Sequence, residues 1–367
     1  MSEFFIQLVT DRQECFQCHK TVTGKKKLSK CSRCHAITYC GKECQLADWA
    51  RHKYNCIPVM VTEIEGKGRG LVAARDIKMG ELLFLDKTVI KLPKHPSNAK
   101  AYQSLKKQMG NPQTEAMLQL YKLPVGSKWS TVTNRSPRTT IRELEIFLHN
   151  SVTVGDSWLL FVNAALLNHS CAPNAVRETF EQTKDGDVRV EVRAIKDINK
   201  GEEITVFYNN YKDYSYKELG STTQERMMAI RKKFDFDCKC CVCSGKVPGQ
   251  EDIIKELLEL HGTLDDEAGQ VLTTDRTPQI KKKPSDWAKD LKTIDKIVDL
   301  NQKLYIGSVY DKEWSLELLM RAAAMAGDRD LLKKAMEGCK KLSEDTNMID
   351  ISLRYKCMKN TFGSKIA

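Results

Sequence analysis

The sequence has no apolar run long enough to cross a membrane, which takes about 20 consecutive apolar residues. It also has no N-terminal apolar segment typical of a secretory signal peptide. These absences argue against a membrane protein and against a secreted one. The 14 cysteines are therefore expected to stay reduced, because disulfides are rare in the cytosol and nucleus. We expect a cytoplasmic and/or nuclear protein whose cysteines bind metal.

Three further patterns are missing. The expected elements do not alternate as βαβ units, which argues against a doubly wound parallel sheet. No fixed-period repeat is evident, although stacked helix pairs stay an alternative. The cysteine-rich segment lacks C2H2 spacing and a clear recognition helix, so direct DNA binding is not expected. The net charge of +11 is a weak signal for nucleic acid, because eleven metal-bound thiolates and three zinc dications would lower it to about +6.

What the sequence does have is a dense run of metal-ligand residues in its first 58 positions. Paired spacing of this kind is typical of zinc sites, and a short basic segment has too little apolar sequence to fold without metal. Spacing alone leaves open whether successive or interleaved pairs share an ion. A helix is expected after Cys40 that carries Cys44, with the last two ligands at i and i+4 on one helix face. The eight candidate ligands are Cys15, Cys18, Cys31, Cys34, Cys40, Cys44, His52 and Cys56.

The middle of the chain favours an α+β fold. Short strands are expected within 60–92 and again within 152–208, where Asp185-Gly186 is typical of a hairpin turn. Residues 97–147 are polar and mainly helical in pattern, with apolar residues at helical spacing from 141 to 149. A helix is expected over 217–234, and amphipathic helices from 251 to the end form core seams.

One polar string stands out at 168–174, Asn-His-Ser-Cys-Ala-Pro-Asn. It follows an apolar run from Phe161 to Leu167 that is typical of a strand. A nucleophilic pair of His169 and Cys171 is conceivable, but side chains on a strand alternate between faces, so we expect the pair to need a bend. Cys171 is more useful as a zinc ligand. A structural zinc takes four ligands, and the downstream run supplies three, namely Cys238, Cys240 and Cys243.

These strings, taken in order, resemble the SET methyltransferase domain. The resemblance rests on Lys67-Gly-Arg-Gly-Leu71, the Asn168 string, Gly201-Glu-Glu-Ile204 with Phe207-Tyr208, and the cysteine run after 238. The first 58 residues resemble a MYND zinc finger. Together they are similar to the SET- and MYND-domain (SMYD) family of protein-lysine methyltransferases. The finger precedes the Lys67–Leu71 segment, as in the arthropod SMYD-A branch.

The resemblance implies three domains: a MYND finger at 1–58, a SET domain at 59–245 and a helical domain at 246–367. Within the SET domain, 97–147 is a helical insertion and 213–245 the post-SET region. It also implies interleaved zinc pairing. Cys15, Cys18, Cys40 and Cys44 hold one ion, Cys31, Cys34, His52 and Cys56 a second, and Cys171, Cys238, Cys240 and Cys243 a third. Cys241 is an extra thiol.

The resemblance further implies the cofactor S-adenosylmethionine (SAM) and the residues around it. Its methionine part is expected at Lys67, Gly68 and Arg69, and its adenine and amino groups at Asn168 and His169. Phe236 is expected to cover the cofactor. Tyr208 is the expected catalytic phenol, which orients the substrate amine. Phe234 stands where the family often has a second channel aromatic with a hydroxyl, so the number of methyl groups added is an open question.

Two functions follow as hypotheses. The first is a SAM-dependent lysine methyltransferase acting on histone and/or non-histone proteins, with a role in transcriptional regulation. The second is a zinc-stabilised adaptor whose finger binds proline-containing peptides and whose SET fold is idle. Binding of SAM distinguishes the two.

Overall fold

The computed structural model describes most of the chain. The described residues are 15, 17–18, 20, 28–34, 37–53, 56–94, 98–110, 117–118, 120, 138–181, 188–208, 222–264, 284–305, 309–346, 352, 355–356 and 359–360. The chain divides into two compact units. The first comprises Met1–Lys78, Leu82–Asn168 and Arg177–Thr205, and the second comprises Met79–Glu81, His169–Val176 and Val206–Ala367.

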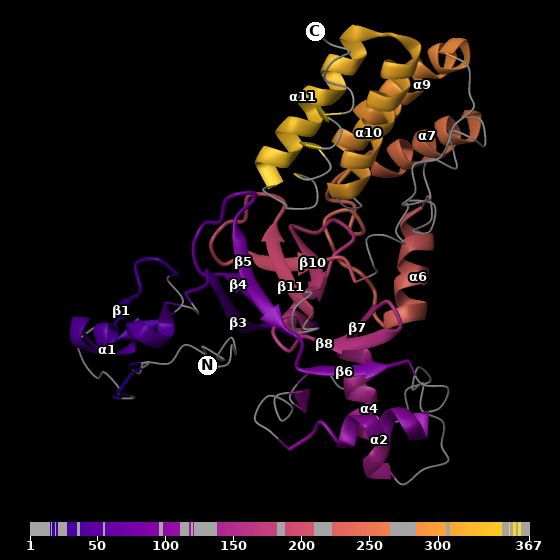
Figure 1. Ribbon diagram of the computed structural model, residues 1–367. Helices are drawn as coiled ribbons and strands as arrows, with labels where there is room; N and C mark the ends of the chain where they lie inside the picture. The colour runs from indigo at the N-terminus through magenta and orange to yellow at the C-terminus, as the bar shows by residue number, and fades with distance from the viewer. Residues whose placement is uncertain are drawn as a thin grey trace. The chain divides into compact units, whose positions relative to one another are not determined.

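The cysteine-rich segment of the first unit is built from very short elements. Strands β1 (Ser29–Lys30) and β2 (Thr38–Tyr39) pair antiparallel, and helix α1 (Lys42–His52) follows (Figure 1). Its buried cluster consists mainly of cysteines and Tyr39, with Ala74 from the following segment. An apolar core this small cannot pay the entropy cost of ordering the chain, so bound metal must stabilise it.

Three small sheets contain the other strands, most of whose residues lie in the first unit. The four-stranded sheet has the order β3-β4-β12-β9, and the two three-stranded sheets have the orders β10-β11-β5 and β6-β8-β7. Every pair whose register is resolved is antiparallel. The strands are β3 (Val59–Ile64), β4 (Gly68–Ala73), β5 (Leu82–Lys87), β6 (Ile90–Pro93), β7 (Ser151–Val154), β8 (Ser157–Leu160), β9 (Asn168–His169), β10 (Ala175–Glu181), β11 (Val188–Ala194) and β12 (Glu203–Val206). The fold is α+β, as the sequence predicts. The expected turn at Asp185-Gly186 lies outside the described residues.

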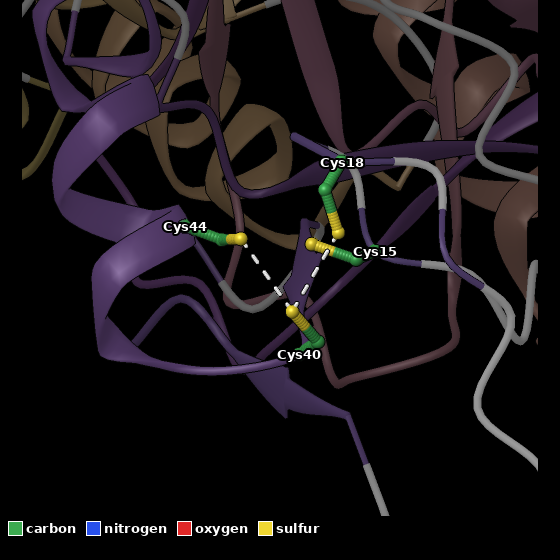
Figure 2. Close-up of side chains that lie close together, drawn as sticks. All are labelled: Cys15, Cys18, Cys40 and Cys44. Carbon is green, nitrogen blue, oxygen red and sulfur yellow. Dashed lines mark hydrogen bonds between the residues drawn. The ribbon is translucent and has the colours of Figure 1, made fainter.

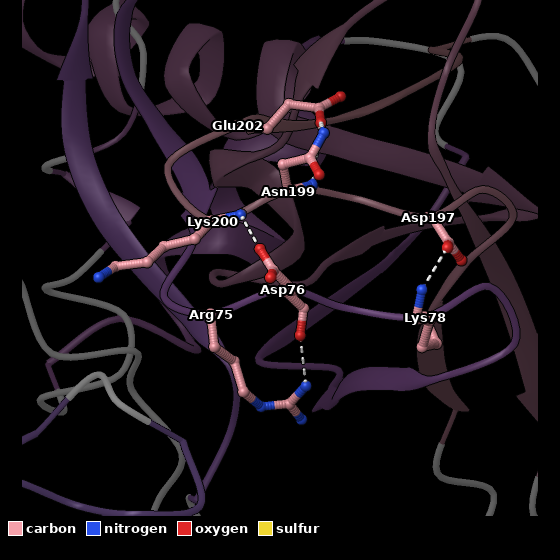
Figure 3. A network of polar contacts seen from close by, with 7 residues as sticks. All are labelled: Arg75, Asp76, Lys78, Asp197, Asn199, Lys200 and Glu202. Atoms are coloured by element: carbon pink, nitrogen blue, oxygen red, sulfur yellow. Dashed lines mark hydrogen bonds and ion pairs between the residues drawn. The ribbon is translucent and has the colours of Figure 1, made fainter.

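Hydrogen bonds join the chain segment after β4 to the segment before β12 (Figure 3). Ile77 and Ile198 exchange backbone hydrogen bonds of 2.8 and 2.9 Å. Beside them, the Asp76 carboxylate accepts a hydrogen bond from the backbone N–H of Lys200 at 2.8 Å. The Lys78–Asp197 ion pair is exposed and adds little, because solvent screens it. The reciprocal backbone bonds therefore hold the chain just before β12 next to the end of β4.

Helices α2 (Asn98–Lys106) and α4 (Arg138–Asn150) lie in or partly in 97–147, the stretch whose sequence pattern is mainly helical. Their apolar residues share one buried cluster with strands β6 and β8. Leu144 and Phe147, three residues apart on α4, are both buried in it, which matches the helical spacing seen in the sequence. Most of the segment between the two helices lies outside the described residues.

The second unit is largely helical. Helix α6 (Thr223–Phe234) begins with a capping box in which Thr222 and Glu225 satisfy each other's backbone N–H groups. Helices α7 (Gln250–Thr263), α9 (Pro284–Lys303), α10 (Val309–Ala326) and α11 (Arg329–Thr346) follow, and α10 packs between α9 and α11 (Figure 1). Buried Ile294, Leu319 and Leu332 lie on the predicted apolar stripes. Among the described residues, no helix combines the length and apolar character that a membrane span requires.

Candidate functional site

The first metal-ligand set joins two distant segments of the finger. Sγ of Cys18 lies 3.7 Å from Sγ of Cys40, which lies 3.5 Å from Sγ of Cys44 (Figure 2). Cys15 completes the set, and all four sulfur atoms lie within 4.8 Å of one another. A disulfide would bring two sulfur atoms to about 2.05 Å. Four thiolates around one zinc at about 2.3 Å would instead be about 3.8 Å apart, so the geometry fits a shared ion.

One thiol of this set, that of Cys15, has a lowered pKa, whereas the pKa values of Cys40 and Cys44 are raised. Burial disfavours the charged form of Cys15, but hydrogen bonds from the backbone N–H groups of Cys18 and Cys40 outweigh it and lower the pKa of the thiol to about 6. A thiol with that pKa is deprotonated at neutral pH, as a zinc ligand must be.

The second set consists of Cys31, Cys34, His52 and Cys56. Sγ of Cys34 lies 3.6 Å from Nε2 of His52, so this ring nitrogen faces the thiols. The edges of Tyr39 and Trp49 contact the imidazole, with ring centroids 6.2 and 5.9 Å away. The expectation that His52 and Cys56 share a helix face is wrong. Helix α1 ends at His52, and Cys56 reaches the set from the chain beyond it.

The third set lies in the second unit. It consists of Cys171 with Cys238, Cys240 and Cys243, and Sγ of Cys171 lies 3.8 Å from that of Cys238 and 3.7 Å from that of Cys243. Each of the three sets thus has the membership that the resemblance implies, and each could hold one zinc ion. Cys241 does not belong to the third set. Its backbone carbonyl accepts hydrogen bonds from the N–H groups of Lys246 and Val247.

The residues expected around the methionine part of SAM lie in the first unit. The Asn168 amide donates to the carbonyl of Arg69 at 3.3 Å and to Oε1 of Glu203 at 2.9 Å. The other oxygen of Glu203 pairs with the Lys67 ammonium at 2.5 Å. The Glu203 carboxylate therefore holds two of the expected cofactor residues in place. It belongs to the Gly201–Ile204 string, but nothing in the sequence shows this role.

A second carboxylate that the sequence does not reveal, that of buried Asp86, binds the chain ahead of Asn168. Asp86 on β5 accepts hydrogen bonds from the backbone N–H groups of Asn163 and Ala164 at 2.8 and 2.9 Å. It also accepts from the Asn163 amide and from the N–H of Lys87. Burial raises the pKa of Asp86 to about 6, and these four donors only partly offset that effect. Asp86 thereby fixes the chain five residues before Asn168.

The same bonds overturn the expected strand from Phe161 to Leu167. The segment is a turn followed by a single 3-10 turn at Ala164–Leu166. Its N–H groups bond to Asp86 and, through local bonds such as Leu167 to Ala164, to the segment itself instead of to a neighbouring strand. The apolar run is buried in a loop, which local periodicity cannot distinguish from a buried strand.

The expected catalytic and cofactor-covering aromatics lie in the second unit. The Tyr208 ring centroid is 5.2 Å from that of Phe234 and 6.3 Å from that of Phe236, in edge-on arrangements. His169 lies against all three rings and against Phe207. The backbone N–H of Tyr208 donates to Nδ1 of His169 at 3.2 Å. Tyr208 thus sits in an apolar aromatic cluster, its backbone fixed by the imidazole.

His169 and Cys171 meet where the chain bends, as expected for this pair. Nε2 of His169 lies 3.5 Å from Sγ of Cys171. Strand β9 ends at His169, and the chain bends at Cys171. Because Cys171 also belongs to the third metal-ligand set, this contact does not make it a free nucleophile.

Comparisons with known proteins agree with this geometry. The family model of the MYND finger matches residues 15–56, and that of the SET domain matches residues 68–209. The chain belongs to the SET- and MYND-domain (SMYD) family. The first match spans both metal-ligand sets of the finger, and the second contains Gly68, the Asn168 string and Tyr208.

The relatives found by these comparisons are identical to this chain at about a quarter of the aligned residues. N-lysine methyltransferase SMYD2-A of Danio rerio is 25% identical over 285 residues, covering 69% of this chain and 59% of the relative. Histone-lysine N-methyltransferase ASHR1 of Arabidopsis thaliana is 28% identical over 252 residues, covering 64% and 47%. N-lysine methyltransferase SMYD2 of Homo sapiens is 26% identical over 253 residues, covering 66% and 54%. The chain therefore spans only about half the length of these relatives.

A solved structure of Arabidopsis thaliana SUVH6 in complex with SAM aligns to 42% of this chain and 27% of its own, at 16% identity. The TM-score is 0.24, which is too low for a comparison of folds.

Proposed function

We propose that this chain is a SAM-dependent protein-lysine N-methyltransferase acting on histone and/or non-histone proteins, with a role in transcriptional regulation. The observation that carries the proposal is Tyr208, whose ring lies among Phe234 and Phe236 and whose backbone is held by His169. The names of the relatives, lysine and histone-lysine methyltransferases, support the same chemistry.

The residues of the first unit fit the methionine part of SAM. Asn168 Oδ1 and the Arg69 guanidinium have no hydrogen-bond partner within the described part of the chain, so an acceptor and a cation are available for an amino acid group. A Cβ atom added at Gly68 would meet nothing within 4 Å, and the positive φ of +74° favours glycine there. As SAM contacts we propose the residues that the family resemblance implies, which are Lys67, Gly68, Arg69, Asn168, His169, Tyr208 and Phe236.

In the proposed reaction, SAM supplies an electrophilic methyl group on a sulfonium. The lysine nitrogen uses its lone pair to form the new N–C bond, while the electrons of the S–C bond go to sulfur. The amine must first lose a proton, and an apolar aromatic surrounding disfavours the charged ammonium and so lowers its pKa. The Tyr208 hydroxyl orients the neutral nitrogen. Catalysis then rests on alignment, with no covalent enzyme intermediate.

The test is SAM calorimetry on the zinc-loaded chain, followed by transfer of labelled methyl groups to histones and to a cell lysate. We expect Tyr208→Phe to bind SAM normally but to label lysine at least about 100-fold more slowly, because the amine loses its orienting group. Tyr305→Phe is the matched control, since Tyr305 is an exposed tyrosine just beyond α9, which ends at Lys303. Full activity of Tyr208→Phe would refute the assigned role.

A second function is supported by one observation on the finger. Leu46 and Trp49 on α1 are 63% and 38% exposed and lie three residues apart, so they share a helix face. We propose that the finger also acts as a protein-interaction module, with proline-containing peptides as its partners. If the SET domain is idle, the chain gives no heat with SAM but binds such peptides, and Leu46→Asp weakens that binding.

We also keep three expectations as proposals. The domains are taken as 1–58, 59–245 and 246–367, the branch as the arthropod SMYD-A type, and the location as the cytoplasm and/or nucleus. Localisation by a fluorescent fusion tests the last of these.

A further inference from the structure

The imidazole of His169 is buried, and both of its nitrogens have a partner. Nδ1 lies 3.2 Å from the backbone nitrogen of Tyr208, and Nε2 lies 3.5 Å from Sγ of Cys171. One partner is the proposed catalytic residue, and the other is a member of the third metal-ligand set. A single side chain therefore connects the two.

The direction of these bonds follows from one fixed donor. A backbone N–H can only donate, so Nδ1 of His169 must carry a lone pair and accept from Tyr208. The neutral ring then has its proton on Nε2, which points at the sulfur of Cys171. A metal-bound thiolate accepts such a bond, and partners of this kind orient ligands and tune the metal.

We propose that His169 is a positioning residue which, as the Nε2–H tautomer, transmits the geometry of the third metal-ligand set to the backbone of Tyr208. The link to catalysis rests on the proposed function, whereas the bond to Cys171 does not. With both nitrogens engaged, the imidazole has no lone pair or proton left for SAM or for general-base work. His169 then contacts SAM only through its backbone.

The surrounding rings favour this role. His169 has Phe207 at 5.0 Å, Tyr208 at 5.3 Å and Phe236 at 5.8 Å between ring centroids. Such packing restricts rotation of the imidazole. A shift of Cys171 therefore moves the backbone of Tyr208, because His169 cannot compensate by changing its rotamer. Release of the third zinc would accordingly loosen Tyr208.

The tautomer is tested directly on the zinc-loaded full chain. With ¹⁵N-labelled histidine, long-range ¹H–¹⁵N spectra should show His169, assigned by its absence in His169→Gln, with a protonated Nε2 and an unprotonated Nδ1. A protonated Nδ1 would overturn the proposal, because the Tyr208 N–H would then face another donor. This measurement requires no methyl transfer.

Two variants separate the two bonds. His169→Asn places an amide oxygen near the Nδ1 position and can keep the bond from Tyr208, but it loses the donor to Cys171. His169→Gln places an amide N–H near the Nε2 position and loses the acceptor for Tyr208. His149→Asn is the control, because His149 on α4 belongs to none of the three metal-ligand sets.

Zinc loss to a chelator and SAM-dependent turnover are then measured on each variant. We expect His169→Asn to lose one of three zinc ions about 10- to 100-fold more readily, the range typical for loss of such a partner. We expect His169→Gln to retain its zinc and to keep its KM for SAM, but to have a lower kcat. Wild-type zinc retention in both variants would overturn the metal link. If the two variants lose and retain zinc as expected but the wild type transfers no methyl group, only the proposed function is refuted.

Discussion

Gly70 offers a steric test of the Asn168 site. It lies buried on β4, opposite Thr62 of β3, and its φ is not in the left-handed region. Alanine can therefore adopt the backbone conformation. A Cβ atom at this position would nevertheless lie 2.7 Å from Nδ2 of Asn168 and 2.7 Å from Cγ1 of Ile64. Gly70→Ala thus presses on Asn168 without straining the backbone.

The size of the effect follows from these distances. Ordinary contacts of a Cβ atom begin near 3.4 Å, so each neighbour must move by roughly 0.7 Å. The Asn168 amide cannot do so without lengthening its bonds to Glu203 and to the Arg69 carbonyl. Overpacking of this kind typically costs about 1–3 kcal/mol. If about 2 kcal/mol of this cost is lost from the binding free energy of SAM, SAM affinity falls about 30-fold.

Calorimetry with SAM and chemical denaturation, both with zinc present, measure the two consequences. Gly338→Ala is the matched control, since a Cβ atom there would lie 2.6 Å from Cδ2 of Leu316 in the C-terminal helices. That clash is with the end of a flexible side chain, and alanine favours the helix by about 1 kcal/mol, so we expect little net change. Wild-type SAM affinity in Gly70→Ala, or an equal loss in Gly338→Ala, would refute the assignment of Asn168.

Three other predictions concern the metal, a buried carboxyl and the product. Cys171→Ser should lower the zinc content from three ions to two by mass spectrometry, while Cys241→Ser should keep three; three ions in Cys171→Ser would exclude it as a ligand. Burial raises the folded-state pKa of Asp86 from 3.8 to about 6, so the fold favours the protonated carboxyl. As pH rises from about 4 to 6, the free energy of unfolding of the wild type should therefore fall by up to about 3 kcal/mol relative to that of Asp86→Asn. A flat difference across that range, from denaturation curves, would contradict the pKa shift. Phe234→Tyr adds a hydroxyl near Tyr208 and should reduce the number of methyl groups per lysine, which intact-peptide mass spectrometry would show.

Sequence patterns located the ligands but not their arrangement. Paired cysteines at zinc spacing identify candidates because tetrahedral coordination needs them close together. Which pairs share an ion depends on how the chain between them folds back, and here β1 and β2 form that connection. The helix face expected for His52 and Cys56 was wrong because α1 ends at His52, and helix ends are the least predictable part of a helix.

The long-range polar contacts could not be predicted from local sequence. Asp86 lies 77 positions from Asn163, and Glu203 lies 35 from Asn168, so neither pairing leaves a trace in periodicity. In the sequence, Asp86 and Glu203 are single acidic residues within stretches that have a strand pattern, and nothing local indicates their partners. The turn at Ala164–Leu166 follows from one of these contacts, which explains why an apolar run was taken for a strand.

The most direct test of the account is transfer of a labelled methyl group from SAM to protein lysine by the chain carrying all three zinc ions. The account predicts SAM binding, labelled lysine with the wild type, and a severe loss of labelling with Tyr208→Phe. A fully zinc-loaded chain that gives no heat with SAM at high micromolar concentration would contradict it.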